Sequence, residues 1–407
     1  MTTSEDEEEQ VTVEGARSGM WRWVMRGRDP GQTHRPATPL ELLFDLTFVV
    51  AVSQAASQLH HALASGHVGA GLVGYAGVFF AIWWAWMNFT WFASAYDTDD
   101  VPYRLLTLVQ MGGVLVLAAG IPEAFEHYDF AVVTLGYVIM RVAMIAQWLR
   151  AAVEHPAGRP SALRYAAGIA VVQLGWVARL FAPESWTYAT FAVLVVAELA
   201  VPMWAEFRGS ATSWHPGHIA ERYGLFTIIV LGEVLLAAHA AVESGLTEHG
   251  GSADLVLIAV GGLVLVFALW WIYFTGAEAR LTSLRVALTW GYGHFAVFGA
   301  LAALGAGLES AVDAAGHHAA VSEQQASLAV ALPVVAVLLV LAGLHRLTGT
   351  GAVGRRLFVA VGALVVLGLA FTAPVLGLGG AVVAMAAAAS ATLAVNLVVS
   401  HRRAVQR

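Results

Sequence analysis

The chain has 407 residues, of which 58% are hydrophobic and only 12% are charged, whereas a soluble domain carries about 25% charged residues. This composition excludes an ordinary soluble domain and predicts an all-α fold, a polytopic membrane helix bundle. Cysteine is absent, which excludes disulfides, thiolate metal sites and cysteine nucleophiles. The formal net charge of -7 comes partly from an acidic run at residues 4–10 and therefore indicates little about partners.

Residues 1–36 precede the first long apolar stretch. Residues 1–20 are acidic and polar and lack the basic and apolar regions of a signal peptide, so we expect a disordered cytoplasmic tail. The following "WRWVMRGR" combines Trp21 and Trp23 with several arginines, a pattern typical of an anchor at the membrane surface. A solvated linker ahead of the membrane fits the same residues equally well.

About twelve apolar stretches follow, each near the length of roughly 20 residues with which a helix crosses a hydrocarbon core of about 30 Å. We place them at 40–59, 68–93, 103–122, 128–150, 162–182, 186–204, 221–242, 253–275, 284–308, 326–345, 356–373 and 379–399.

The arginines alternate from one connection to the next. The predicted inner connections and the C-terminal tail contain Arg104, Arg150, Arg159, Arg164, Arg208, Arg222, Arg280, Arg285, Arg346, Arg355, Arg356, Arg402, Arg403 and Arg407. On the outer side the pattern leaves only Arg179. Because arginine gathers on the cytoplasmic side, we predict twelve spans with both termini in the cytoplasm.

The sequence also contains an internal repeat. "FAIWWAW" at 80–86 matches "FALWWIY" at 267–273, and each lies in the helix after one that begins with an acidic residue, Glu41 or Glu221. Six helices per half is an even number, so the halves share one orientation. We predict two parallel six-helix repeats, 37–204 and 205–400, and a cytoplasmic tail at 401–407. Chance similarity of tryptophan-rich apolar segments is the alternative.

Two acidic residues lie in the first apolar stretch, "TPLELLFDLTFVVAVSQ". Glu41 and Asp45 are four residues apart and share one helix face. A charge at bilayer depth costs roughly 2.5–3.5 kcal/mol, so each needs a partner or a polar cavity. Glu41 also fits a cap at the helix start. By depth, we expect Arg141 of the fourth helix to pair with Asp45, either as a purely structural ion pair or at the border of a substrate path.

The seventh helix carries a second polar motif, "HIAERYGLFTIIVLGEVLLAAH". Glu221 and Arg222 lie at its cytoplasmic entrance, and Glu233 lies about 18 Å further along, too deep to act as a cap. We expect Glu198 of the sixth helix and His294 of the ninth at similar depth. A deep carboxylate with a histidine nearby suits reversible protonation, although a hydrogen-bonded interior role is the more ordinary interpretation of His294 alone.

Together these two motifs resemble the bacterial low temperature requirement protein A (LtrA) family, over about residues 30 to 400. The matching positions of its most distinctive motif are His218, Glu221, Arg222, Gly224, Gly232 and Glu233, and Arg141 within "GYVIMRVAM" also matches. The resemblance implies a many-spanning integral membrane protein of the bacterial cytoplasmic (inner) membrane, associated with growth at low temperature but without a well-defined molecular activity. Val234 departs from the family, in which a small polar residue often follows the glutamate.

The leading functional hypothesis is a secondary transporter with a polar site near the midplane, of which a proton-coupled carrier is one form. Glu233 would be its protonatable centre, with Asp45, Arg141 and His294 as neighbours or gates. The predicted substrate or ion pathway comprises Glu41, Asp45, Arg141, Glu198, Glu221, Arg222, Glu233 and His294. Its support is the internal repeat, in which a carboxylate occurs in only one half at two aligned positions. Ser53 of the first half aligns with Glu233 of the second, and Asp45 of the first half aligns with Leu225 of the second. A cation channel is an alternative, although no selectivity-filter sequence is visible. A non-transporting membrane protein for cold adaptation is another.

The expected partners are the lipid bilayer and an unknown small solute or ion. We find no nucleophile or metal-ligand cluster and no basic face for nucleic acid. The sequence therefore predicts no enzymatic activity, no cofactor, no metal and no nucleic-acid partner.

Overall fold

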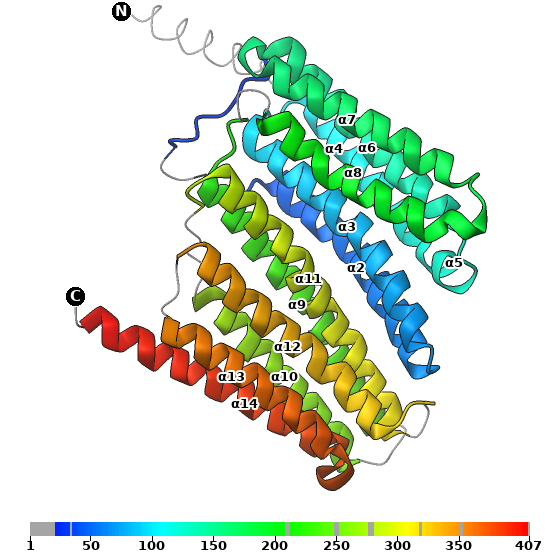
Figure 1. Ribbon diagram of the computed structural model, residues 1–407, viewed down its shortest axis with the longest axis vertical. Helices are drawn as coiled ribbons and strands as arrows, with labels where there is room; N and C mark the ends of the chain where they lie inside the picture. Colours follow the sequence, from blue (N-terminus) through cyan, green and yellow to red (C-terminus); the bar gives the residue numbers. More distant parts are fainter. Residues whose placement is uncertain are drawn as a thin grey trace, which may run out of the picture. The chain divides into compact units, whose positions relative to one another are not determined.

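The computed structural model describes residues 21–32, 35–207, 212–247, 252–275, 281–316, 320–349 and 353–405, and every regular element in these ranges is a helix (Figure 1). The predicted disordered tail at 1–20 lies outside them. The long helices are α2 (Pro39–Ala64), α3 (Val68–Tyr96), α4 (Val101–Ala119), α6 (Ala131–Glu154), α7 (Arg159–Arg179), α8 (Thr187–Phe207), α9 (Pro216–Thr247), α10 (Ala253–Thr275), α11 (Leu284–Ala315), α12 (Glu323–Leu347), α13 (Val353–Leu369) and α14 (Ala373–Val405). The short elements are α5 (Ile121–Glu126), η1 (Pro156–Gly158), η2 (Glu184–Trp186) and η3 (Ala370–Thr372).

Within the described residues, 11 helical ranges are long and apolar enough to cross a membrane. The difference from the expected twelve lies in Leu357–Val399, a range of 43 residues that contains both α13 and α14. A single helix of this length would measure about 65 Å, roughly twice the thickness of a hydrocarbon core. At Gly377 the backbone leaves the helical conformation with a φ of 74°, which glycine adopts at little cost. The range therefore holds two helices, as the apolar pattern predicts.

The chain divides into two compact units. Unit 1 comprises the described residues within Met1–Phe48, Ala85–Gly120 and Asp129–Ile219. In it, α4 packs against α6, α6 against α7, and α7 against α8. The contact between α4 and α6 depends on glycine, because a Cβ atom at Gly136 would lie 2.3 Å from the backbone nitrogen of Leu117. Small residues of this kind let membrane helices approach closely.

Unit 2 comprises the described residues within Val49–Trp84, Ile121–Tyr128 and Ala220–Arg407. Here α11 packs against α12, α12 against α13, α13 against α14, and α10 against α14. A capping box at Ser322 and Gln325 begins α12, because each side chain satisfies a backbone amide that the helix leaves free. Both α2 and α3 contribute one part to each unit.

The predicted repeat stays a prediction. Consecutive helices from the third to the sixth of each proposed half are neighbours, which agrees with a repeat. The two matched tryptophan segments, however, have different surroundings. Trp83 and Trp84 are buried, whereas Trp270 and Trp271 are 43% and 49% exposed.

Helices α2 and α11 are among those that extend beyond their predicted ends. Helix α2 continues to Ala64 and α11 to Ala315, whereas the apolar pattern ends at residues 59 and 308. The predicted boundaries are wrong here because the last turns of both helices carry polar and charged side chains. His60, Glu309 and Asp313 therefore lie in helices and not in loops.

Candidate functional site

Glu41 closes the first turn of α2. The Thr38 amide donates to Glu41 Oε2 at 2.7 Å, and the Glu41 amide donates to the Thr38 hydroxyl at 3.3 Å. This reciprocal pair is a capping box. His218 Nε2 also lies 3.1 Å from Glu41 Oε1, and both side chains are fully buried. Glu41 thus has the capping role that its position predicts, together with a histidine from the second family motif.

Asp45 does not form the predicted ion pair with Arg141. Trp86 of α3 donates its indole N–H to Asp45 Oδ1 at 2.6 Å. Arg141 instead pairs with Glu198 of α8, with 3.5 Å between Nη2 and Oε2. The expectation was wrong because similar depth in the membrane does not make two helices neighbours.

The Arg141–Glu198 pair belongs to a buried polar cluster of α6, α7 and α8. Arg141 donates to the Tyr137 hydroxyl, and Tyr137 donates to Glu198 Oε1 at 2.7 Å. Trp176 donates its indole N–H to the same oxygen at 3.2 Å. Arg141 and Glu198 are each 1% exposed. The cluster pairs its two charges internally, while Arg141 Nε has no hydrogen-bond partner among the described residues. Such a paired and buried network stabilises the packing of the three helices.

A second buried pair lies just before α4. Arg35 donates to the carbonyl oxygens of Ser94 and Ala93 and lies 3.6 Å from Asp97. Burial, followed by the charge of Glu41, raises the pKa of Asp97 to about 6, although Arg35 acts in the opposite direction. Asp97 is therefore a titratable group near neutral pH outside the helices.

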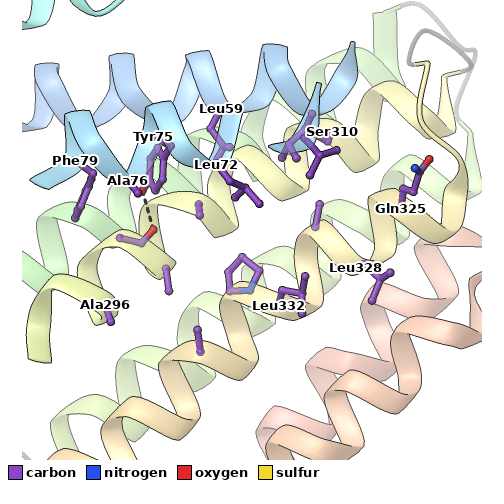
Figure 2. A pocket seen from close by; sticks show the side chains of 18 of the residues that line it. Leu59, Leu72, Tyr75, Ala76, Phe79, Ala296, Ser310, Gln325, Leu328 and Leu332 are labelled. Atoms are coloured by element: carbon purple, nitrogen blue, oxygen red, sulfur yellow. Dashed lines mark hydrogen bonds between the residues drawn. The ribbon is translucent and has the colours of Figure 1, made fainter. Parts of the chain in front are cut away.

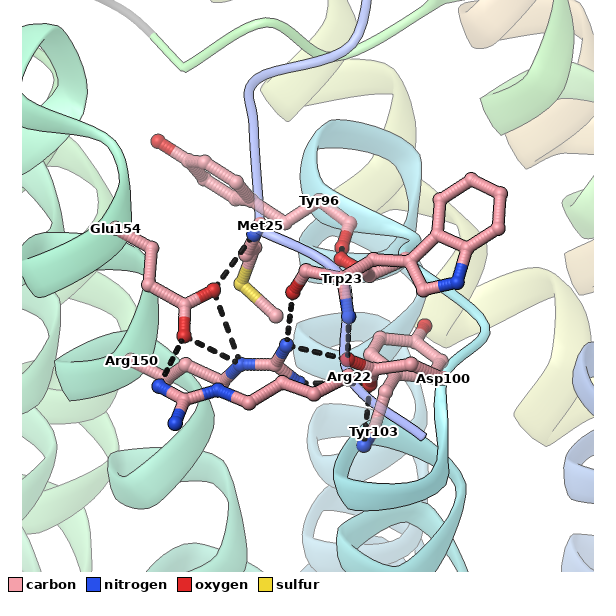
Figure 3. Close-up of polar contacts among 9 residues, drawn as sticks. Arg22, Trp23, Met25, Tyr96, Asp100, Tyr103, Arg150 and Glu154 are labelled. Carbon is pink, nitrogen blue, oxygen red and sulfur yellow. Dashed lines mark hydrogen bonds and ion pairs between the residues drawn. The ribbon is translucent and has the colours of Figure 1, made fainter. Parts of the chain in front are cut away.

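Residues 21–28 are held against the ends of α4 and α6 (Figure 3). The Trp23 amide donates to Asp100 at 2.8 Å, and the Met25 amide donates to Glu154 at 2.6 Å. Arg150 donates to Asp100 at 2.6 Å and to the Trp23 carbonyl at 2.7 Å. Burial acts to raise the pKa of Asp100, but the hydrogen bonds from Arg150 and the backbone amides hold it below its ordinary value. The segment is thus fixed to unit 1, whereas the Trp21 and Trp23 side chains stay exposed.

Glu233 lies in the interior of unit 2, on α9. Its side chain is 7% exposed, and Ser53 of α2 provides a side-chain hydrogen bond to the carboxyl group. Oε1 of Glu233 is buried and has no hydrogen-bond partner among the described residues. A Cβ atom at Gly305 of α11 would lie 3.3 Å from the Glu233 carbonyl oxygen, so the two helices approach closely at this level.

His294 does not lie beside Glu233, contrary to the expectation from depth. Its ring packs edge-on against the Tyr223 ring of α9, with 4.9 Å between the ring centroids. Tyr223 precedes Glu233 by about 15 Å along the helix. The His294 nitrogens contact the Trp290 carbonyl at 2.8 Å and the Tyr273 hydroxyl at 3.1 Å. His294 is therefore a hydrogen-bonded interior residue.

Glu221 and Arg222 lie in the first turns of α9. Arg222 is fully buried and Glu221 is half-buried. The geometry does not test their role in a substrate path, which stays a prediction.

Unit 2 also contains an apolar cavity of about 580 Å³ (Figure 2). Leu72, Tyr75 and Phe79 of α3 line one side, and residues of α11 and α12 line the other. The Tyr75 hydroxyl donates to the Gly299 carbonyl at 2.7 Å, so it is already satisfied. Ser310 and Gln325 are the other polar side chains of the lining. A cavity of this size and composition suits an apolar ligand.

Residues 36–391 match the family described as bacterial low temperature requirement A protein (LtrA). The chain belongs to the LtrA family. The match covers nearly the whole chain and confirms the resemblance predicted from two motifs. Together with the apolar helices, membership identifies a multi-pass integral membrane protein.

One curated relative of this LtrA chain is an uncharacterised protein of Rhizobium meliloti (strain 1021), which is 29% identical over 250 residues. The alignment covers 59% of this chain and 58% of the relative, so the chain matches little more than half of that protein's length.

The sequence did not reveal three of the partners that the LtrA fold brings together. Trp86 and Tyr137 carry no local signal that marks them as hydrogen-bond donors to a carboxylate, because aromatic residues are common in such helices. His60 with Glu309 and Asp313 was assigned to loops, although the four-residue spacing of the two acids is a helical signal. Within the described ranges, no group of three or more His, Cys, Asp or Glu side chains has a geometry that holds a metal ion.

Proposed function

We propose that this LtrA-family protein is a secondary transporter that binds and releases a proton at Glu233, and that it has no enzymatic activity. The observation that carries the proposal is the environment of the Glu233 carboxyl group. It is buried in a membrane-spanning helix, and no arginine or histidine of the described residues lies within 4.0 Å of it.

An isolated carboxylate at this depth is costly, so its charge has to be neutralised by a proton or met by water that reaches Oε1. A carboxylate with a structural role in the same protein has more partners than Glu233. Glu198 has a cation at 3.5 Å and two hydrogen-bond donors. Glu233 has one hydroxyl donor, Ser53. A carboxyl group with so few partners is suited to change its protonation state.

The contact between Ser53 and Glu233 also supports a carrier built from two repeats. These two residues are 180 residues apart in the sequence and occupy aligned positions of the two proposed halves. In repeat-built carriers, the site lies where equivalent helices of the two halves meet. Only one of the two aligned positions carries an acid, which would give a single proton site.

The cavity in unit 2 supports an apolar or amphipathic solute. Tyr75 connects the two features, because its ring lines the cavity and its hydroxyl lies near enough to Glu233 for an electrostatic interaction. A solute that fills the cavity should raise the thermal stability of the purified protein, since a ligand of the folded state stabilises it.

Charge movement on a solid-supported membrane tests the proposal without knowledge of the solute. A pH step applied to proteoliposomes should give a transient current as protons bind, which decays because a carrier without solute does not turn over. Glu233→Gln should abolish the transient. Glu243→Gln, which changes an exposed glutamate of the same helix, should keep it.

A Glu233→Gln protein with an unchanged transient would reject the proton site, and so would a wild-type protein without any transient. A sustained current that follows a potassium gradient at constant pH would favour a cation channel instead.

A further inference from the structure

Three titratable side chains meet near the end of α2 and α11 in unit 2. His60 Nε2 lies 2.7 Å from Asp313 Oδ2, and His60 Nδ1 lies 3.3 Å from Glu309 Oε2. The His60 side chain is 17% exposed and the two acids are each 34% exposed. Each ring nitrogen of His60 therefore lies within ion-pair distance of a carboxylate oxygen, and the contact of Nε2 with Asp313 is a hydrogen bond.

This arrangement favours an additional proton. A neutral imidazole has one N–H donor and one acceptor nitrogen. With both acids ionised, the acceptor nitrogen would face a carboxylate lone pair, which is repulsive. One proton more removes the conflict, either as an imidazolium that contacts both acids or as one neutral carboxylic acid. The cluster thus binds a proton when its three side chains are in contact. When that proton leaves, His60 loses its contact with one of the two acids.

The cluster continues the line on which Glu233 lies. Gly305 of α11 is level with Glu233, and Glu309 and Asp313 follow Gly305 by one and two helical turns, about 6 Å each. Glu309 and Glu233 interact electrostatically. On α2, Ser53 contacts Glu233 and His60 lies two turns further toward Ala64. Proton-binding groups thus extend from Glu233 to the partly exposed end of the two helices.

We infer that Glu309, His60 and Asp313 form a proton relay between Glu233 and the end of unit 2 at the α2–α3 turn. The inference rests on the proposed proton site at Glu233. In this relay Glu309 exchanges a proton with Glu233, His60 passes it between the two acids, and Asp313 exchanges it with water. No bond other than those to the proton changes.

Another histidine lies close to the relay without joining it. The His61 ring lies 5.3 Å from the His60 ring, and its Nδ1 is 2.7 Å from the Ser57 carbonyl oxygen of its own helix. His61 also interacts electrostatically with Glu309. A proton fits the cluster better than a metal cation, because within the described residues these side chains do not have the geometry that holds a metal ion.

The test uses full-length protein in proteoliposomes of one known orientation, with pH steps applied to either side. His60→Gln and Asp313→Asn remove the relay, and His67→Gln is the matched control, since its ring contacts the Ser65 hydroxyl of the α2–α3 turn. With the step on the side of this turn, we expect the transient current of both relay variants to slow by about tenfold. With the step on the other side, the transient should keep its wild-type rate. Asp313→Glu should restore most of the rate.

The outcomes separate the relay from the proton site. If Glu233→Gln is silent while His60→Gln and Asp313→Asn keep wild-type rates on both sides, the relay is rejected and the proton site stands. Equal slowing on both sides would also reject it, because it would indicate a structural effect. A transient that follows a sodium or potassium step at constant pH would overturn the assignment to protons. A wild-type protein without a transient would instead reject the proposed function.

Discussion

The buried pair of Arg141 and Glu198 allows a quantitative prediction about stability. Its charges are 3.5 Å apart, so they attract each other by about 5 kcal/mol at an effective dielectric constant of about 20. Removal of one partner leaves the other charge buried at 1% exposure, and such a loss costs about 3–5 kcal/mol. We expect Arg141→Met and Glu198→Gln each to lower the free energy of unfolding by this amount. The double variant should lose much less than the sum, because no charge is stranded.

The measurement is a double-mutant cycle on the free energy of unfolding, in mixed micelles of mild detergent and sodium dodecyl sulfate. The pair of Arg104 and Asp99 is the control. Its 2.8 Å distance is shorter, but the side chains are 55% and 45% exposed, so Asp99→Asn should cost only about 0–1 kcal/mol. Additive losses in the Arg141 and Glu198 cycle would show that the pair is not coupled and would refute the reasoning.

Three further predictions concern pH, packing and topology. Because burial raises the folded-state pKa of Asp97 to about 6, its ionisation destabilises the fold above that pH by about 3 kcal/mol. The wild type should therefore gain stability relative to Asp97→Asn in thermal unfolding as the pH falls from about 7 to 4, and a relative loss would contradict the assignment. Gly136→Ala should lower the free energy of unfolding by about 1–3 kcal/mol, whereas Gly112→Ala should not, because no atom lies within 4 Å of its added Cβ; equal effects would reject the packing argument. Reporter fusions after Gly66 should read as outside and fusions after Gly158 as inside, and a reversed pair would overturn the arginine-based topology.

The helices could be predicted because apolar stretches of the right length are a strong signal, and the family could be predicted because two long motifs resemble it. The capping role of Glu41 could also be predicted, since an acidic side chain is favoured in the first turn of a helix. The non-helical backbone at Gly377 lies between the predicted apolar stretches 356–373 and 379–399.

The partners of the buried polar residues could not be predicted in the same way. Asp45 was the expected ion-pair partner of Arg141 because both residues lie at similar depth in the membrane. The packing order of the helices decides which side chains meet, and it places Glu198 beside Arg141. Depth also suggested His294 for Glu233. Helix α9 begins at Pro216 and not at the predicted residue 221, which places Glu233 further along its helix than expected. The relay residues were missed because charged side chains in a last helical turn have the composition of a loop.

The central claim is that Glu233 changes its protonation state inside the bilayer, and infrared difference spectroscopy tests it most directly. Spectra of the protein in lipid at acidic and alkaline pH would be subtracted, for the wild type, Glu233→Gln and the control Glu243→Gln. We expect a carboxylic-acid carbonyl band that disappears on alkaline titration in the wild type and in Glu243→Gln and is absent in Glu233→Gln. The same band at full intensity in Glu233→Gln would contradict the account.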